Sequence, residues 1–238
     1  MKTAIMQPYF MPYIGYLSLI KHSDLFILFD PVQFIRHGWI ERNRILKQNE
    51  GWLYIQVPLV KTGRDTLIKE CLIDNSQDWK GKILSQLQIY KKQAPYYYKT
   101  VQLLKEIFEG EYDTITALNK ASLEKICNYL GFPKELPVFS EMNLEIEEPN
   151  SPDEWALNIC KKLDGKIHYI NPIGGLEFFD TEKYTNQHID ISFQKMIPVH
   201  YDQKRTPFEY GLSIIDVMMF NSPEEINNML DQFELVNE

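Results

Sequence analysis

The order of apolar segments at the start of the chain constrains the fold more than any other feature. Residues 3–6 form a short apolar strand that ends at Gln7-Pro8. Residues 14–21 carry apolar side chains at helical spacing, and residues 25–29 are a continuous apolar run typical of a buried strand. A strand–helix–strand crossover of this length favours two parallel neighbouring strands. The loop 7–16 would then lie at the carboxyl edge of the sheet, where open α/β sheets bind ligands.

The remaining segments predict an α/β fold rich in helices. We expect a Rossmann-like parallel sheet flanked by helices, with a mainly helical insertion or annex over about residues 79–163. Residues 32–43 are polar and irregular, and they predict a site-forming loop or a short strand. Residues 62–65, between two strand-like segments, are typical of a hairpin or wider turn. The predicted strands are 53–57, 67–73, 168–170 and 189–197, and the predicted helices are 79–90, 97–109, 114–130, 151–163, 212–220 and 223–233.

Two of these helices begin with a serine that predicts an N-cap. Ser151 is followed by Pro152 and acidic residues, as at many helix starts. Ser213 is followed three residues later by Asp216, the position that Glu or Gln holds in a capping box. We therefore favour a structural role for Ser213 and Asp216 over a serine nucleophile, for which the chain lacks a Gly-x-Ser-x-Gly elbow.

Charge and cysteine content exclude several classes of protein. Lys and Arg number 25 against 33 Asp and Glu, and the net charge of −8 disfavours a nucleic-acid partner. Cys71, Cys127 and Cys160 lie far apart, so we expect no disulfide framework and no metal site. The N-terminus lacks signal-peptide features, and no apolar run approaches the about 20 residues of a membrane helix. These features predict a cytoplasmic protein without a membrane span.

An aromatic loop follows the first predicted strand. The chain has 14 Tyr, 13 Phe and 4 Trp but only 5 His, and many of the aromatic residues lie near this loop. Its prolines hold the backbone extended, and Gly15 permits a close approach at the start of the helix. Free N–H groups there would bind a phosphate or carboxylate, although a tight turn packed over the core explains the same residues. The binding candidates in this loop are Gln7, Tyr9, Tyr13, Gly15 and Tyr16.

The polar segment after the second predicted strand supplies candidate catalytic residues. Asp30 ends a buried strand, where it would orient an amine or act as a general base, unless it is an Asp-Pro turn cap. His37 is a candidate general base because imidazole titrates nearest neutrality, although a lone His is more often a packed or solvent-facing residue. Arg42 offers a planar fork for an anion or else forms a surface ion pair. The further binding candidates are Gln33, Trp39 and Asn43.

These motifs together resemble the WbqC-like protein family. The resemblance rests on the segments 7–16, 30–34 and 39–43, and on the C-terminal residues 201–203, 208 and 212–216, which include Gln203. It spans nearly the whole chain and implies one domain over residues 1–238. Family members are associated with O-antigen and related sugar gene clusters, which implies a group-transfer enzyme. Its small-molecule substrate would be a nucleotide-linked amino sugar, bound in part through Gln203.

A more remote resemblance covers the N-terminal region alone. The strand, the Pro-x-x-Gly loop, the helix and the Asp30-Pro31 turn look like the opening of pantothenate synthetases and nucleotidylyltransferase-type folds. In those proteins two histidines stabilise nucleotide phosphates, and Tyr13 and Tyr16 stand at the matching positions here. A phenol brings no positive charge at pH 7. The alternatives to a transferase are therefore a non-catalytic nucleotide-sugar-binding subunit and an ATP-dependent amide ligase, and the sequence assigns neither a cofactor nor an oligomeric state.

Overall fold

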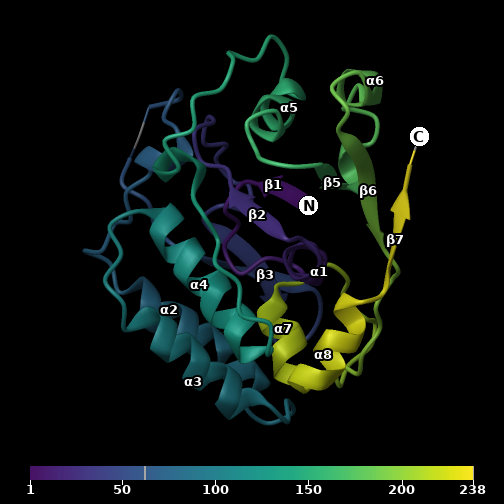
Figure 1. Cartoon of the computed structure of the whole chain (residues 1–238). Coiled ribbons are helices and arrows are strands. Elements are labelled where there is room, and N and C mark those ends of the chain that lie inside the picture. The colour runs from purple at the N-terminus through teal and green to yellow at the C-terminus, as the bar shows by residue number, and fades with distance from the viewer. Residues whose placement is uncertain (62, 238) are drawn as a thin grey trace.

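A mostly parallel sheet of five strands forms the centre of the molecule (Figure 1). The computed structural model describes residues 1–61 and 63–237. The strand order is β2-β1-β5-β6-β7, with β7 antiparallel to β6 and the other neighbours parallel. The strands of this sheet are β1 (Lys2–Met6), β2 (Leu25–Leu28), β5 (His168–Pro172), β6 (Asp190–Met196) and β7 (Phe233–Val236). The predicted α/β class with a parallel sheet is confirmed.

The direction of chain winding reverses at β1. Helix α1 (Ile14–His22) connects β1 to β2 on one side, and the pairing of Thr3 with Leu25 confirms the predicted parallel crossover. On the other side β1 pairs with β5, which follows much later in the chain. The carboxyl ends of β1 and β5 therefore flank the topological switch point, the position where open α/β sheets leave a crevice for ligands.

Helices cover both faces of this sheet. Alternate residues of its strands point to opposite sides: Ala4 and Leu28 join the larger core, whereas Ile5 and Ile27 join the smaller one. The larger core also contains residues of α1 to α4, α7 and α8, and the smaller core contains residues of α5 and α6. Figure 1 shows α5 and α6 on the side of the sheet away from α2 to α4. The helices after α1 are α2 (Trp79–Gln86), α3 (Tyr97–Phe108), α4 (Ile115–Tyr129), α5 (Glu154–Cys160), α6 (Thr181–Thr185), α7 (Ile214–Phe220) and α8 (Pro223–Leu230).

A separate antiparallel hairpin corrects one part of the sequence prediction. Strand β4 (Trp52–Gln56) agrees with the strand expected at 53–57, but its partner is β3 (Arg42–Leu46). Residues 67–73 are not a strand: they contain the 3-10 helix Ile68–Glu70, whose Glu70 carboxylate accepts a hydrogen bond from the Leu67 N–H at 3.0 Å. The hairpin turn consequently lies between β3 and β4. Residues 63–65 lie within a wider turn, because Leu59 and Ile73 form an antiparallel bridge and the Val60 N–H donates to the Leu72 carbonyl at 2.9 Å; Thr62 is outside the described residues.

Helix and strand ends differ from the prediction where side chains form unforeseen bonds. Asp153, and not Ser151, is the N-cap residue of α5, because the Ser151 hydroxyl donates to the Asp153 carboxylate instead. Helix α8 ends at Leu230 and not at residue 233 as predicted, since the next residues turn into β7. Helix α6 was missed because five residues are too short to show helical periodicity.

One buried asparagine fixes both loops that follow the first strands. The Nδ2 atom of Asn119, on α4, donates to the carbonyl oxygens of Pro8 at 2.8 Å and of Ile40 at 2.9 Å. Pro8 belongs to the loop after β1, and Ile40 to the segment before β3. Both carbonyls depend on this amide, because buried backbone groups without a partner are costly.

Replacement of this amide tests its role. We expect Asn119→Ala to lower the free energy of unfolding by about 2–4 kcal/mol, since it leaves two carbonyls without their donor. Asn128→Ala, at an exposed position of the same helix, should change it by less than about 0.5 kcal/mol. Urea denaturation monitored by circular dichroism measures both. Equal effects of the two variants would contradict the assigned role.

Candidate functional site

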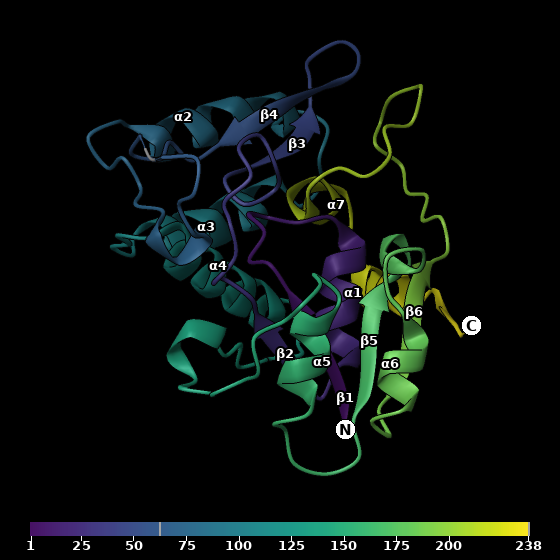
Figure 2. The same cartoon turned by 90° about the horizontal axis from the view of Figure 1, so that it is seen from above.

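A cavity of about 360 Å³ opens at the topological switch point. Met6 at the end of β1 and Pro172 at the end of β5 both line it, as the strand order requires. Figure 2 shows the β3–β4 hairpin beside α7, and a hydrogen bond of 2.9 Å from the Ser213 N–H to the Arg44 carbonyl joins them next to the cavity. The other lining residues are Tyr9, Pro12, Tyr13, Trp39, Asn43, Arg44 and Gly211. The predicted loop at the carboxyl edge of the sheet therefore forms one wall of a ligand-sized cavity.

Two tyrosines form the wall that belongs to the loop after β1. Tyr9 packs on Tyr16 with ring centroids 5.4 Å apart, and burial raises the pKa of Tyr9, with a smaller contribution from Tyr13. Burial likewise raises the pKa of Tyr13. Both phenols are therefore neutral at pH 7, and they can donate hydrogen bonds but cannot act as bases.

The ring of Tyr13 covers the start of α1. A Cβ atom at Gly15 would lie 2.4 Å from the Tyr13 Cε2 atom, so only glycine permits this arrangement. The close approach that Gly15 was expected to allow is therefore made by a side chain of the same loop.

Arg44 supplies the positive charge of the cavity. Its Nη2 atom donates to the Gly211 carbonyl at 3.0 Å, and its guanidinium lies 5.4 Å from the Trp39 ring. Its buried Nε atom has no hydrogen-bond partner, and no carboxylate forms an ion pair with Arg44 in residues 1–61 and 63–237. Asn43 lies beside it, with its side-chain amide donating to the Phe10 carbonyl at 3.1 Å. An unpaired guanidinium at the wall of a cavity favours an anionic ligand.

Arg42, the arginine proposed from the sequence, is held away from the cavity. Its guanidinium donates to the His37 and Gly38 carbonyls and lies 3.9 Å from the centre of the Tyr54 ring. Sequence reasoning missed Arg44 because residues 42–46 were not recognised as one strand of a hairpin. Residues two positions apart in a strand point to the same face, so a strand over residues 42–46 would place Arg42 and Arg44 on one face. This spacing was the sequence signal for Arg44.

The two candidate catalytic residues do not line the switch-point cavity. Asp30 is buried, and its carboxylate accepts hydrogen bonds from the N–H of Ser140 at 3.1 Å and from its hydroxyl at 2.7 Å. His37 lines a separate cavity of about 190 Å³ with Glu41, whose pKa is raised by burial. The backbone N–H of His37 donates to the Glu41 carboxylate at 3.0 Å. Neither Asp30 nor His37 is therefore placed against a ligand in the cavity described above.

Three further binding candidates also lie outside the cavity wall. The Gln7 carbonyl accepts a hydrogen bond of 2.8 Å from the hydroxyl of Tyr16, whose ring is buried in the core. The exposed Gln33 side chain donates to the Arg64 carbonyl at 2.7 Å. The structure thus brings together Tyr9, Tyr13, Trp39 and Asn43 from the sequence candidates and leaves Gln7, Tyr16 and Gln33 apart.

Gln203 belongs to a buried polar cluster centred on Asp216. The Asp216 carboxylate accepts hydrogen bonds from Tyr90 at 2.6 Å, Tyr201 at 2.5 Å and Gln203 at 3.1 Å. Burial raises the pKa of Asp216 to about 6, although these three donors oppose the shift. The Gln203 side-chain amide also donates to the Glu209 carbonyl and accepts a hydrogen bond from the Glu209 N–H. The cluster thereby fixes the segment that leads to Gly211 at the cavity.

The predicted N-cap at Ser213 is confirmed, and the predicted role of Asp216 is corrected. The Ser213 hydroxyl accepts a hydrogen bond from the Ile215 N–H at 3.2 Å and donates to the Met11 carbonyl at 2.7 Å. Asp216 does not complete a capping box, because its carboxylate is bound by the hydroxyl and amide groups of the buried cluster.

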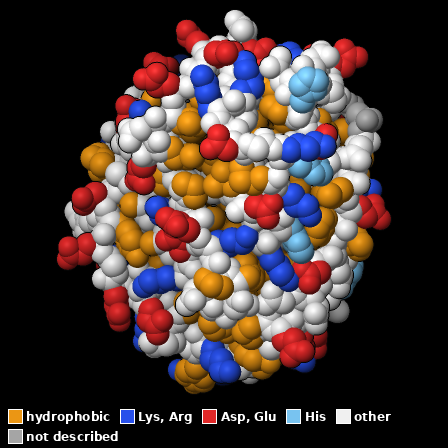
Figure 3. All heavy atoms as spheres, viewed as in Figure 1, with side chains coloured by type: hydrophobic (Ala, Val, Ile, Leu, Met, Phe, Trp, Pro, Cys, Tyr) orange, Lys and Arg blue, Asp and Glu red, His pale blue; other side chains and the backbone are white. Residues whose placement is uncertain are grey.

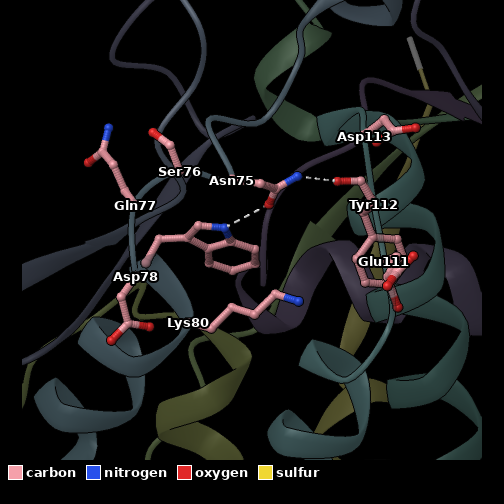
Figure 4. A pocket seen from close by; sticks show the side chains of 9 residues that line it. Asn75, Ser76, Gln77, Asp78, Lys80, Glu111, Tyr112 and Asp113 are labelled. Carbon is pink, nitrogen blue, oxygen red and sulfur yellow. Dashed lines mark hydrogen bonds between the residues drawn. The ribbon is translucent and has the colours of Figure 1, made fainter.

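A second hollow, of about 600 Å³, lies near the start of α2 (Figure 4). Its side chains already have structural partners: the Asn75 amide bridges the Trp79 indole and the Tyr112 carbonyl, and Asp78 caps α2. Lys80 donates to the carbonyls of Phe108 and Gly110. None of the residues that line this hollow belongs to a strand of the main sheet, whereas Met6 and Pro172 of that sheet line the switch-point cavity.

The surface and the cysteines add two observations. Acidic and basic side chains are interspersed on the face seen in Figure 3, with apolar patches between them. Cys71, Cys127 and Cys160 are buried and unpaired, and burial raises the pKa of Cys160 to about 12.

Within the described residues, no group of three or more His, Cys, Asp or Glu is placed to hold a metal ion. None of the helices in that part of the chain is both long and apolar enough to cross a membrane.

Fold and cavity together define an α/β protein with a ligand-sized cavity at the switch point of its sheet. The profile of the WbqC-like protein family matches residues 7–228, and the chain belongs to this family. It is 28% identical over 232 residues to the uncharacterized protein Rv1507c of Mycobacterium tuberculosis, an alignment that covers 96% of this chain and 97% of that protein. No solved structure matches the chain significantly.

The raised pKa of Asp216 makes a prediction about stability. Because the folded state raises this pKa from 3.8 to about 6, the contribution of Asp216 is fully present below about pH 4 and is lost as the pH rises through 6. We expect the unfolding free energy of the wild type, relative to Asp216→Asn, to fall by about 2 kcal/mol between pH 4 and pH 8. Urea denaturation across this range measures the difference.

Asp202→Asn serves as the matched control. Asp202 is exposed, and its pKa is lowered by hydrogen bonds from Lys204, so its contribution changes with pH in the opposite direction. A wild-type advantage over Asp216→Asn that stays constant from pH 4 to pH 8 would contradict the raised pKa.

Proposed function

We propose that the protein is a group-transfer enzyme that acts on a nucleotide-linked amino sugar. The observation that carries the proposal is the unpaired Arg44 guanidinium at the wall of an aromatic cavity, at the switch point of the sheet. The association of WbqC-like proteins with O-antigen and related sugar gene clusters supports the choice of substrate and a place in surface-polysaccharide biosynthesis. The proposed site residues in the cavity wall are Tyr9, Tyr13, Trp39, Asn43 and Arg44.

Each part of such a substrate has a chemical counterpart in the cavity. Sugar rings present apolar C–H patches, which suit the faces of Tyr9 and Tyr13. Sugar hydroxyls match the neutral phenol hydroxyls of Tyr9 and Tyr13, whereas the Asn43 amide is already bound to the backbone of Phe10 and Arg44. The phosphates match the Arg44 guanidinium, which is planar and charged at every physiological pH.

The proposed reaction is acyl transfer to the amino group of the sugar. The amine lone pair forms a C–N bond to the carbonyl carbon of an acyl thioester, the C–S bond breaks, and the thiolate takes up the proton that the nitrogen releases. The side chains of the cavity would orient the amine, and a neutral phenol would donate a hydrogen bond to the carbonyl oxygen as it gains negative charge.

A second candidate function follows from the composition of the cavity wall. The described residues that line the cavity include no carboxylate, imidazole or thiol. Asp30 and His37, which the sequence offers as bases, lie elsewhere. This composition favours a non-catalytic subunit that binds a nucleotide-linked sugar.

Turnover distinguishes the two candidates. Purified protein is incubated with a nucleotide-linked amino sugar and a set of acyl thioesters, with and without ATP, and the products are followed by mass spectrometry. N-acylated sugar supports the transferase. Tight binding of the sugar nucleotide without product supports the binding subunit, and absence of both product and binding contradicts both functions.

Truncation of Arg44 tests the position of the site. We expect Arg44→Ala to weaken binding of the nucleotide-linked amino sugar by about 10–100-fold, because hydrogen bonds to a charged group contribute roughly 1.5–3 kcal/mol. Arg64→Ala, at an exposed position outside the cavity, should leave the affinity unchanged. Isothermal titration calorimetry measures both. Unchanged binding by Arg44→Ala would place the ligand elsewhere.

A further inference from the structure

An exposed aromatic surface continues outward from the cavity along the β3–β4 hairpin. Trp39 and Trp52 remain 37% and 39% exposed, although large aromatic side chains gain free energy by burial. Trp52 contacts Tyr54 on the same strand, with ring centroids 4.9 Å apart. We call Trp39 and Trp52 the tryptophan pair.

Arg44 connects the tryptophan pair to the cavity. Its guanidinium carbon lies 5.4 Å from the Trp39 ring and 5.1 Å from the Trp52 ring, and Arg44 and Trp39 both line the cavity. Trp52 therefore lies next to Arg44 but is not one of the residues that line the cavity. The ring of Tyr54 does not offer a free face for stacking, because the Arg42 guanidinium lies 3.9 Å from its centre.

We propose that the tryptophan pair binds the nucleobase of the nucleotide-linked substrate. This inference rests on the proposed function and adds the orientation of the ligand: the sugar lies in the cavity, the diphosphate at Arg44, and the base against the exposed faces of Trp39 and Trp52. Tyr9 and Tyr13 line the cavity, Arg44 lies at its wall, and Trp52 lies outside the lining residues beside Arg44. This arrangement matches the order sugar, diphosphate and base. Every base presents a flat π-face that stacks on an aromatic side chain.

The size of the cavity agrees with this orientation. Its volume of about 360 Å³ is near the lower end of the range of about 300–1,000 Å³ for small-molecule sites. A sugar with its first phosphate suits such a volume, and the nucleoside then extends over the hairpin. Because Trp39 and Trp52 retain exposed ring surface, stacking of a base there buries apolar area without a rearrangement of the fold.

Three probes and three variants test the proposal by calorimetry. The probes are uridine diphosphate, inorganic pyrophosphate, which lacks a base, and a uridine-diphosphate-linked amino sugar. We expect Trp52→Ala to weaken uridine diphosphate and its sugar conjugate roughly tenfold and to leave pyrophosphate unchanged. Trp52→Phe should retain most of the affinity because it keeps an aromatic face. Tyr98→Ala, which removes an exposed aromatic side chain outside the cavity wall, should have no effect.

The outcomes separate this inference from the proposed function. If the wild type binds the sugar nucleotide but Trp52→Ala binds it equally well, the base does not stack there and the inference is wrong, while the proposed function stands. An equal loss for uridine diphosphate and pyrophosphate would also overturn it, since Trp52 would then act by positioning Arg44. If the wild type binds no nucleotide-linked amino sugar, the proposed function itself is overturned.

Discussion

The parallel pairing of β1 with a neighbour on each side determines where the switch-point cavity lies. Because α1 returns the chain to β2 on one side, β5 must add on the other, and the carboxyl ends of β1 and β5 are left without a crossover between them. Met6 and Pro172 at these ends line the cavity. The other residues that line the cavity belong to loops or to the β3–β4 hairpin. The strand order therefore sets the position of the cavity, and the loops and the hairpin supply its polar and aromatic side chains.

The aromatic residues of the first loop serve two purposes. Tyr16 and Phe10 are buried, and the Tyr16 hydroxyl binds the Gln7 carbonyl, so these residues hold the loop on the core. Tyr9 and Tyr13 face the cavity with phenols that burial keeps neutral. The resemblance to nucleotidylyltransferase-type folds places Tyr13 and Tyr16 at the histidine positions, yet the positive charge comes from Arg44 on a different element. If the site binds phosphate, it does so with a guanidinium from the hairpin.

The sequence alone supported the fold near the N-terminus better than the details of the site. The β1–α1–β2 unit was predictable because its signals are local: short apolar runs, helical spacing and proline between them. Strand alternation could place Arg44 on the same face as Arg42, but the choice between the two arginines depends on the pairing of β3 with β4, because both have the same chemistry. Asp30 was a candidate by residue type and Gln203 through the family resemblance, but their polar atoms are bound by Ser140, 110 residues from Asp30, and by Asp216, 13 residues from Gln203. Such long-range partners leave no periodic pattern in the chain.

The central claim is that the switch-point cavity is the ligand site. A crystal structure of the protein with a bound uridine-diphosphate-linked amino sugar tests it most directly. We predict that the sugar lies between Tyr9 and Asn43 and that the diphosphate contacts the Arg44 guanidinium. A ligand found instead in the hollow beside Asn75 and Tyr112, with the switch-point cavity empty, would contradict the account.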